Sequence, residues 1–311
     1  MTNRQLSALC GAFLAGSLLV AGTNVVLVRS ALRAPPSAGR VPVVAVMPRI
    51  KGDPYFASCR GGAEEAAREL GIELIWEGPI GPDSTEQIQI VETWITRRVD
   101  AIAVAAADQA GISPVLRKAR AHGIPVVAWD SDAEPDARDL FVNPANSRET
   151  GQILAGRAAC LLHGHGEFAI LTGASNSAGQ WIAGKYPELK LASIQSSGDD
   201  RDRAFLETQA ILRVRPGVKL IVALSPPAVP GAAEAVLQSG RQDVKVIGLS
   251  WNTRDLGYLT VQAATLLARH RLAADADSLP AGRLGNRDVC GGEIVLGPPL
   301  VPLSGNLRSS H

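Results

Sequence analysis

Aromatic residues and cysteines are both scarce in this chain of 311 residues. Phenylalanine, tryptophan and tyrosine together make up 4% of the sequence. Of the four cysteines (Cys10, Cys59, Cys160 and Cys290), no two have the C-x-x-C spacing of a zinc or redox motif. A disulfide framework is therefore not expected, and we interpret the cysteines as small buried residues.

An excess of charge of either sign is also lacking. The chain has 31 Lys and Arg against 30 Asp and Glu, a net charge of +1, and no run of basic residues. Because binding to nucleic acid requires a concentrated basic face, this balance argues against nucleic acid as a partner. A small neutral or weakly polar ligand fits the composition better.

Motifs for enzymatic chemistry are missing as well. The sequence contains neither G-x-G-x-x-G after its first apolar segment, nor G-x-x-x-x-G-K-[ST], nor G-x-S-x-G. His163 and His165 lack a nearby third metal ligand, so we interpret them as a helix end and turn. The sequence predicts no catalysis and no cofactor. An α/β enzyme remains an alternative, whereas a repressor is disfavoured because an apolar leader replaces the basic helix-turn-helix.

The leader is the long uncharged run of residues 6–28, which follows Arg4 and precedes Arg29, Arg33 and Arg40. Its length suits either an export signal or an uncleaved membrane anchor. We expect residues 1–40 to be a signal peptide or anchor plus linker. The remainder is then exported to the periplasm, and it contacts the membrane only through residues 6–28 if the leader is retained.

From residue 43 onward, short apolar segments alternate with helical patterns. Strands are predicted at 43–47, 72–76, 101–106, 126–129, 168–171, 191–194, 219–223, 245–248 and 293–296. This alternation predicts an α/β fold of two doubly wound parallel-sheet lobes joined by hinge crossovers. We expect residues 41–144 with 252–285 to form the first lobe, and 145–251 with 286–311 the second.

Polar side chains follow the predicted strands of the first lobe. Asp130 and Ser131 come directly after a strand that is apolar on both faces, where ligands of parallel sheets collect. Asp108 follows the neighbouring strand and either caps a helix or binds ligand. We interpret Asp130 as a ligand contact, whereas Asp132 more simply orders the loop.

Two adjacent aromatic residues, Tyr55 and Phe56, follow the first strand together with Arg49 and Asp53. Such a cluster is either core packing or a stacking platform with polar anchors. A sugar ring requires the second combination, an aromatic face for its C–H groups and charged groups for its hydroxyls. Candidate contacts beyond strands of the second lobe are Gln180, Trp181, Ser225, Pro226, Trp251 and Asn252.

Together these segments resemble the periplasmic sugar-binding proteins of ABC transporters, specifically the group of type I fold that contains the rhamnose-binding and autoinducer-2-binding proteins. The resemblance rests on residues 53–56 with 61–63, 99–104, 127–132, 225–230, 251–252 with 255–258, and 281–285. It implies that a sugar-like ligand closes between the lobes, contacts Tyr55, Phe56 and Asp130, and passes to the permease subunits. It implies no catalysis.

The chain departs from this family in its second lobe, which is expected to be shortened. About 14 residues separate Ala174 from Leu189, and Ser250 leads directly into Trp251, where the family interposes a helix and a strand. Two alternatives therefore stay open. One is a membrane-anchored sensory or accessory subunit that signals to a membrane partner, and the other is a degenerate copy that binds weakly.

Overall fold

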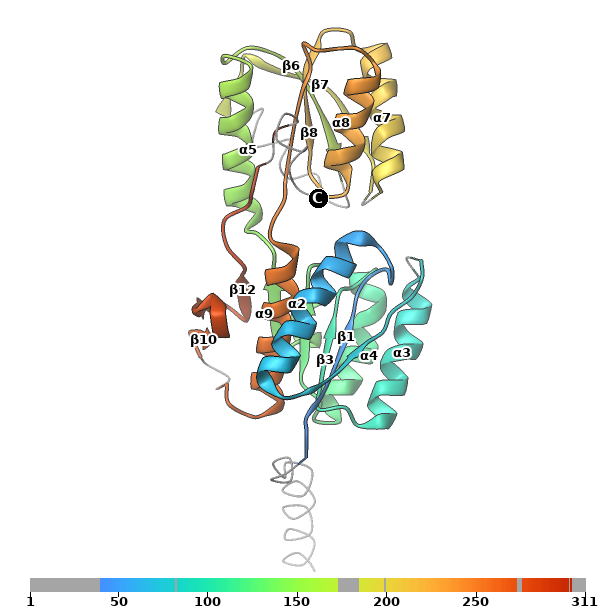
Figure 1. Ribbon diagram of the computed structural model, residues 1–311, viewed down its shortest axis with the longest axis vertical. Helices are drawn as coiled ribbons and strands as arrows, with labels where there is room; N and C mark the ends of the chain where they lie inside the picture. Colours follow the sequence, from blue (N-terminus) through green and yellow to red (C-terminus); the bar gives the residue numbers. More distant parts are fainter. Residues whose placement is uncertain are drawn as a thin grey trace, which may run out of the picture.

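A computed structural model describes residues 40–81, 83–172, 185–198, 200–272, 276–301 and 303. The chain forms two lobes placed end to end and joined by crossing segments (Figure 1). Each lobe contains a parallel sheet with helices on both faces, so the predicted fold class is confirmed. Within the described ranges no helix has the length and apolarity to cross a bilayer. The predicted leader lies outside these ranges.

The first lobe contains a six-stranded sheet in the order β12-β5-β4-β3-β1-β2, and every neighbouring pair is parallel. Its strands are β1 (Val43–Met47), β2 (Glu73–Trp76), β3 (Ala101–Val104), β4 (Val126–Trp129), β5 (Leu140–Asn143) and β12 (Glu293–Val295). Helices α2 (Pro54–Leu70) and α9 (Thr253–Ala268) cover one face, and α3 (Ser84–Arg97) and α4 (Gln109–Ala121) cover the other. Alternate residues of β1 are buried on opposite faces, as strand geometry requires.

The position of β12 corrects the predicted lobe boundaries. Glu293 pairs with Phe141 and Val295 with Asn143, so this strand lies at the edge of the first sheet rather than in the second lobe. The preceding hairpin of β10 (Ser278–Pro280) and β11 (Asn286–Asp288) is antiparallel and packs with the first lobe through Leu279. We predicted that residues 286–311 belong to the second lobe. For residues 286–296 this prediction was wrong, because they lie in the first lobe.

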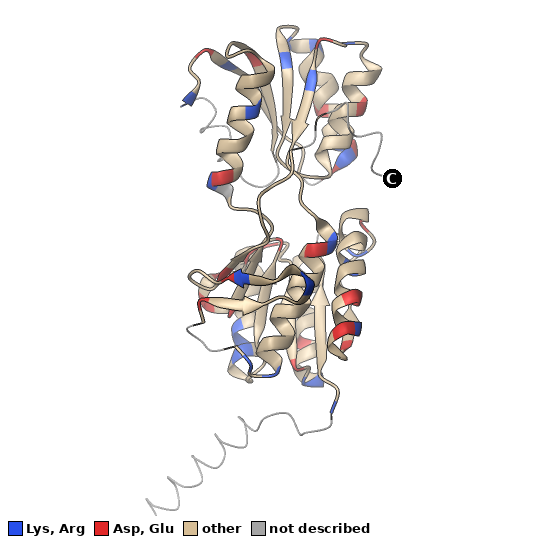
Figure 2. Cartoon of the chain, turned by 60° about the vertical axis from the view of Figure 1, so that its left-hand side comes forward, with Lys and Arg blue, Asp and Glu red and all other residues tan. Residues whose placement is uncertain are grey.

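The second lobe is the smaller one among the described residues, with a four-stranded sheet in the order β7-β6-β8-β9. Its strands are β6 (Gly166–Thr172), β7 (Leu189–Ser196), β8 (Val218–Ala223) and β9 (Lys245–Gly248). Helix α5 (Ser147–Leu161) packs on one face, and α7 (Arg201–Val214) and α8 (Ala228–Gln238) pack on the other. Basic and acidic residues are interspersed over both lobes (Figure 2).

Three chain segments connect the lobes in the part of the chain that the structure describes. The first runs from β5 to α5, the second from β9 to α9, and the third from β12 towards Leu303, which bridges to Ile247 of β9. The second and third crossovers lie side by side, because Ser250 and Leu300 exchange two backbone hydrogen bonds of 2.9 and 2.7 Å. The hinge thus contains a short paired region rather than independent linkers.

Helices α2 and α9 approach each other closely at two glycines. A Cβ atom on Gly62 would lie 1.7 Å from the carbonyl oxygen of Arg254, and one on Gly257 would lie 1.9 Å from that of Cys59. Only glycine, which has no Cβ atom, permits the two helices to lie this close together. The close contact places the first turn of α2, which contains Tyr55, beside the hinge end of α9.

Candidate functional site

A cleft opens between the carboxyl ends of the first-lobe strands and the facing loop of the second lobe. The space between its walls, including the part open to solvent, is about 560 Å³. The lining residues are Arg49, Ile50, Asp53, Tyr55, Phe56, Asp130, Leu224, Ser225, Pro226, Pro227 and Trp251. Eight of the predicted site residues therefore lie around one cavity.

Asp130 is held at the base of this cleft in an unusual backbone conformation. It follows β4 directly with a φ of +61°, in the left-handed region that aspartate tolerates better than most residues. Its N–H donates to the carbonyl oxygen of Val142 over 3.2 Å. One carboxylate oxygen accepts from Nη2 of Arg49 at 2.9 Å, and the same nitrogen donates to Oγ of Ser131 at 2.9 Å. Ser131 thus supports the ion pair, and it is not among the cleft-lining residues.

Tyr55 contacts the other oxygen of the same carboxylate. Asp53 caps α2 by accepting from the N–H of Tyr55 at 2.7 Å, which fixes the start of the helix. The Tyr55 hydroxyl donates to Oδ1 of Asp130 and accepts from Nε1 of Trp251 at 2.8 Å. Burial, followed by the negative charge of Asp130, raises the pKa of Tyr55 well above its ordinary value of about 10. The phenol therefore remains a neutral donor at physiological pH.

Buried aromatic rings pack against Tyr55 and hold it in place. Phe56 packs edge-on between Tyr55, with ring centroids 4.9 Å apart, and Trp129, with centroids 5.7 Å apart. It is 5% exposed, so core packing accounts for most of its surface. The indole of Trp129 is fixed in turn by a hydrogen bond of 3.1 Å to the carbonyl oxygen of Met47. Tyr55 and Trp251, with centroids 6.3 Å apart, form the aromatic side of the cleft.

The described wall of the second lobe is mostly apolar. It consists of Leu224, Ser225, Pro226 and Pro227, which connect β8 to α8. The Ser225 hydroxyl donates to the carbonyl oxygen of Gly198 at 3.2 Å, and the residue is 4% exposed. Gln180 and Trp181, the other predicted contacts from this side, lie outside the described residues.

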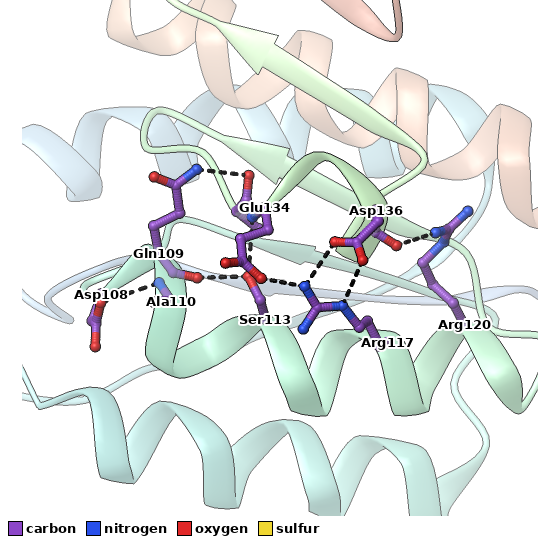
Figure 3. Close-up of polar contacts among 9 residues, drawn as sticks. Asp108, Gln109, Ala110, Ser113, Arg117, Arg120, Glu134 and Asp136 are labelled. Carbon is purple, nitrogen blue, oxygen red and sulfur yellow. Dashed lines mark hydrogen bonds and ion pairs between the residues drawn. The ribbon is translucent and has the colours of Figure 1, made fainter.

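Two predicted site residues are helix caps instead of cleft residues. Asp108 accepts from the N–H of Ala110 at 3.2 Å at the start of α4 (Figure 3). Asn252 caps α9 by accepting from the N–H of Asp255 at 3.0 Å. Neither lines the cleft. Of the two alternatives for Asp108 the structure shows the cap, and the expectation that Asp108 and Asn252 line the cleft was wrong.

Sequence reasoning missed Ile50, Leu224 and Pro227 as lining residues, and it missed the role of Arg138. The three lining residues directly adjoin predicted contacts, so their proximity in sequence was an available signal. Arg138 forms a two-point ion pair with Asp132, the residue expected to order the loop, at 2.5 and 3.0 Å. Nothing in the sequence distinguishes Arg138 from the surrounding charged residues.

Comparison with known proteins shows which family the chain resembles. Residues 44–265 match the family model of the periplasmic binding protein domain. The D-ribose/D-allose-binding protein of Pseudomonas aeruginosa is 30% identical over 261 residues, which cover 77% of this chain and 78% of that protein. The D-apiose import binding protein of Actinobacillus succinogenes is 24% identical, covering 66% and 69% of the two chains.

Solved structures agree with the fold. An ABC transporter solute-binding protein from Clostridium phytofermentas with bound L-rhamnose superposes with a TM-score of 0.77. It is 24% identical, and the match covers 86% of this chain and 97% of that structure. The expected resemblance is therefore confirmed, and the chain belongs to the periplasmic binding protein domain family.

Proposed function

We propose that this protein captures a neutral sugar or a related polyol between its lobes and delivers it to the permease subunits of an ABC transporter. The proposed contacts are Arg49, Asp53, Tyr55, Phe56, Asp130, Ser225, Pro226 and Trp251. The protein acts in the periplasm as a binding protein without catalytic activity. Ligand contacts to both lobes at once favour the closed form that the permease recognises.

The observation that carries this proposal is the position of the Asp130 carboxylate. Its side chain is 6% exposed, yet it borders a solvent-connected cleft and is paired with Arg49. A charged pair held in place on one side of a cleft is suited to bidentate hydrogen bonding with vicinal hydroxyls. The adjacent Tyr55 and Trp251 rings offer surface for the C–H face of a sugar.

The charge of the cleft supports a neutral ligand. Among the described residues, its lining contains one cationic residue, Arg49, and two anionic residues, Asp53 and Asp130. An anionic ligand such as a sugar phosphate would meet this excess of negative charge. The relatives named above, a D-ribose/D-allose-binding protein and a D-apiose import binding protein, agree with this choice.

A thermal-shift screen of the purified chain tests the proposal. The panel comprises D-ribose, D-allose, D-apiose, L-rhamnose, xylitol and autoinducer-2, with ribose 5-phosphate as an anionic comparison. A ligand at a hundred times its dissociation constant should stabilise the folded protein by about 2.7 kcal/mol. We expect one or a few neutral members to raise the melting temperature. A cooperative melt that no member of the panel shifts would contradict the proposal.

A further inference from the structure

We propose that Arg138 is a positioning residue of the cleft: it holds Asp132, and through Asp132 the backbone that aims the Asp130 carboxylate at the ligand. The inference rests on the proposed ligand-binding role of Asp130. It adds a residue outside the cleft whose contacts decide how well the cleft is formed.

The backbone of Asp130 needs restraint from its surroundings. A non-glycine residue with a φ of +61° is less stable than one in the ordinary regions and persists when its surroundings restrain it on both sides. On the preceding side, Trp129 is fully buried and hydrogen-bonded to Met47. Arg49 and Tyr55 hold the carboxylate itself, so the backbone on the following side is what remains to be restrained.

Arg138 provides that restraint. Its Nε donates to Oδ1 of Asp132 at 2.5 Å and its Nη2 to Oδ2 at 3.0 Å, so both carboxylate oxygens are held. The Asp132 carboxylate also accepts from the N–H of Ala133 at 2.8 Å. This restrains the chain at Asp132, two residues after the left-handed residue.

The guanidinium of Arg138 is itself fixed. Its side chain is 8% exposed, Nη1 donates to the carbonyl oxygen of Gly292 at 3.2 Å, and it lies 5.5 Å from the centre of the Phe141 ring. The same carbonyl oxygen accepts from the N–H of Phe141 at 2.7 Å. Gly292 directly precedes β12, so Arg138 fastens the loop after Asp130 to the segment that leads into the third crossover.

Arg117 of α4 offers a matched control, because its partners lie in the same loop. It binds Glu134 and also Asp136, with donor–acceptor distances of 2.9 and 2.8 Å to the latter (Figure 3). Its side chain is 40% exposed, and its partners lie further along the chain from Asp130 than Asp132 does. Arg117 thus anchors the far end of the loop to α4, whereas Arg138 anchors the end that adjoins the cleft.

The test compares Arg138→Lys with Arg117→Lys in the purified chain. Both keep the positive charge, but lysine cannot form the two-point contact of a guanidinium. The first readout, amide hydrogen exchange at residues 130–133, requires no ligand. The second is the affinity for whichever sugar of the panel binds the wild type, measured by titration calorimetry together with the melting temperature.

We expect Arg138→Lys to speed exchange at residues 130–133 and to weaken affinity, each by about tenfold, as loss of a charge-assisted hydrogen bond does. Arg117→Lys should leave both within about twofold while exchange near residue 135 rises. Unchanged exchange at residues 130–133 in Arg138→Lys would overturn the inference. So would a lower melting temperature with unchanged affinity, which is the result of a purely structural role. If the wild type binds no sugar, the proposed function fails, while the exchange comparison still tests the restraint on Asp130.

Discussion

The indole N–H of Trp251 donates a hydrogen bond of 2.8 Å to the hydroxyl of Tyr55, although 196 positions separate the two residues in the sequence. Trp251 belongs to the crossover from β9 to α9, and Tyr55 lies in the first turn of α2. The Tyr55 hydroxyl also donates to Asp130. A hinge segment is thus hydrogen-bonded to the group that holds the main carboxylate of the cleft, so movement of the second lobe is linked to the geometry of the site.

Replacing Asp130 by asparagine should weaken ligand affinity while keeping the fold. Asparagine tolerates the left-handed conformation, so the change removes the charge and leaves the backbone in place. We expect affinity for a bound sugar to fall by about 10- to 100-fold, the effect of losing a hydrogen bond to a charged group. Asp108→Asn is the matched control, because asparagine caps helices as well as aspartate does. Titration calorimetry measures the affinity of both variants. An equal loss of affinity in the two would contradict the assignment of Asp130 as a ligand contact and Asp108 as a helix cap.

Tyr55→Phe should change how stability depends on pH. The pKa of Tyr55 is raised above its ordinary value by burial and by Asp130, so the folded state binds the phenolic proton more tightly than the unfolded chain. Its contribution is complete below about pH 10 and is lost as pH rises from there towards the folded-state pKa. In that window the wild type should lose up to about 1.4 kcal/mol of unfolding free energy per pH unit from this group, and Tyr55→Phe should not.

Urea unfolding at several pH values between about 8 and 11 measures this difference. Cys59 and Tyr258 also have raised pKa values. Both residues are present in the wild type and in the variant, so their contributions to the pH dependence of stability cancel in the comparison. Parallel stability curves for the wild type and Tyr55→Phe would show that the Tyr55 proton is not held as described.

Gly62→Ala should destabilise the first lobe, whereas Gly61→Ala should not. The new Cβ at position 62 would overlap the backbone oxygen of Arg254, so α2 and α9 must separate, at a cost of about 1–3 kcal/mol or more. At position 61 the nearest atom is Nη1 of Arg254 at 3.3 Å, the end of a flexible side chain. There the better helix propensity of alanine should add up to about 1 kcal/mol. Denaturant unfolding of both variants provides the comparison, and similar midpoints would contradict the close packing.

Thiol labelling should distinguish the three described cysteines. Cys59 is buried, and burial followed by the negative charge of Asp130 raises its pKa. Cys160 and Cys290 are exposed, so the expectation of burial was wrong for these two. Iodoacetamide at neutral pH should therefore modify Cys59 at least about 100-fold more slowly than the other two. Peptide mapping by mass spectrometry resolves the sites, and in denaturant the three rates should converge. Rapid modification of Cys59 in the folded protein would contradict its burial beneath the cleft.

Much of the fold was predictable because local patterns of apolar residues indicate the strands. The run Val126–Trp129 is apolar at every position, and the structure buries it between two helix layers. The pairing of β12 was not predictable in this way. A three-residue strand at Glu293–Val295 contains nothing that specifies a partner about 150 residues earlier, because that pairing depends on the path of the whole chain.

The site, too, has some features that local sequence predicts and others that depend on the path of the whole chain. Asp108 and Asp130 both follow strands, but a helix begins directly after Asp108, whereas a loop containing Pro135 follows Asp130. That local difference was readable, and it separates Asp108 from Asp130. The contacts of Arg138 with Asp132 and Gly292 were not readable, because they arise from the three-dimensional course of the loop and β12.

The position of β12 also has a consequence for biosynthesis. The core of the first lobe includes residues of α9 and Ile294, which leave the ribosome after the whole of β6 to β9. The second lobe is in effect an insertion, and its sheet is made from one uninterrupted stretch of chain between residues 166 and 248. The lobe whose synthesis begins first therefore cannot complete its sheet until the whole sheet of the second lobe has been synthesised.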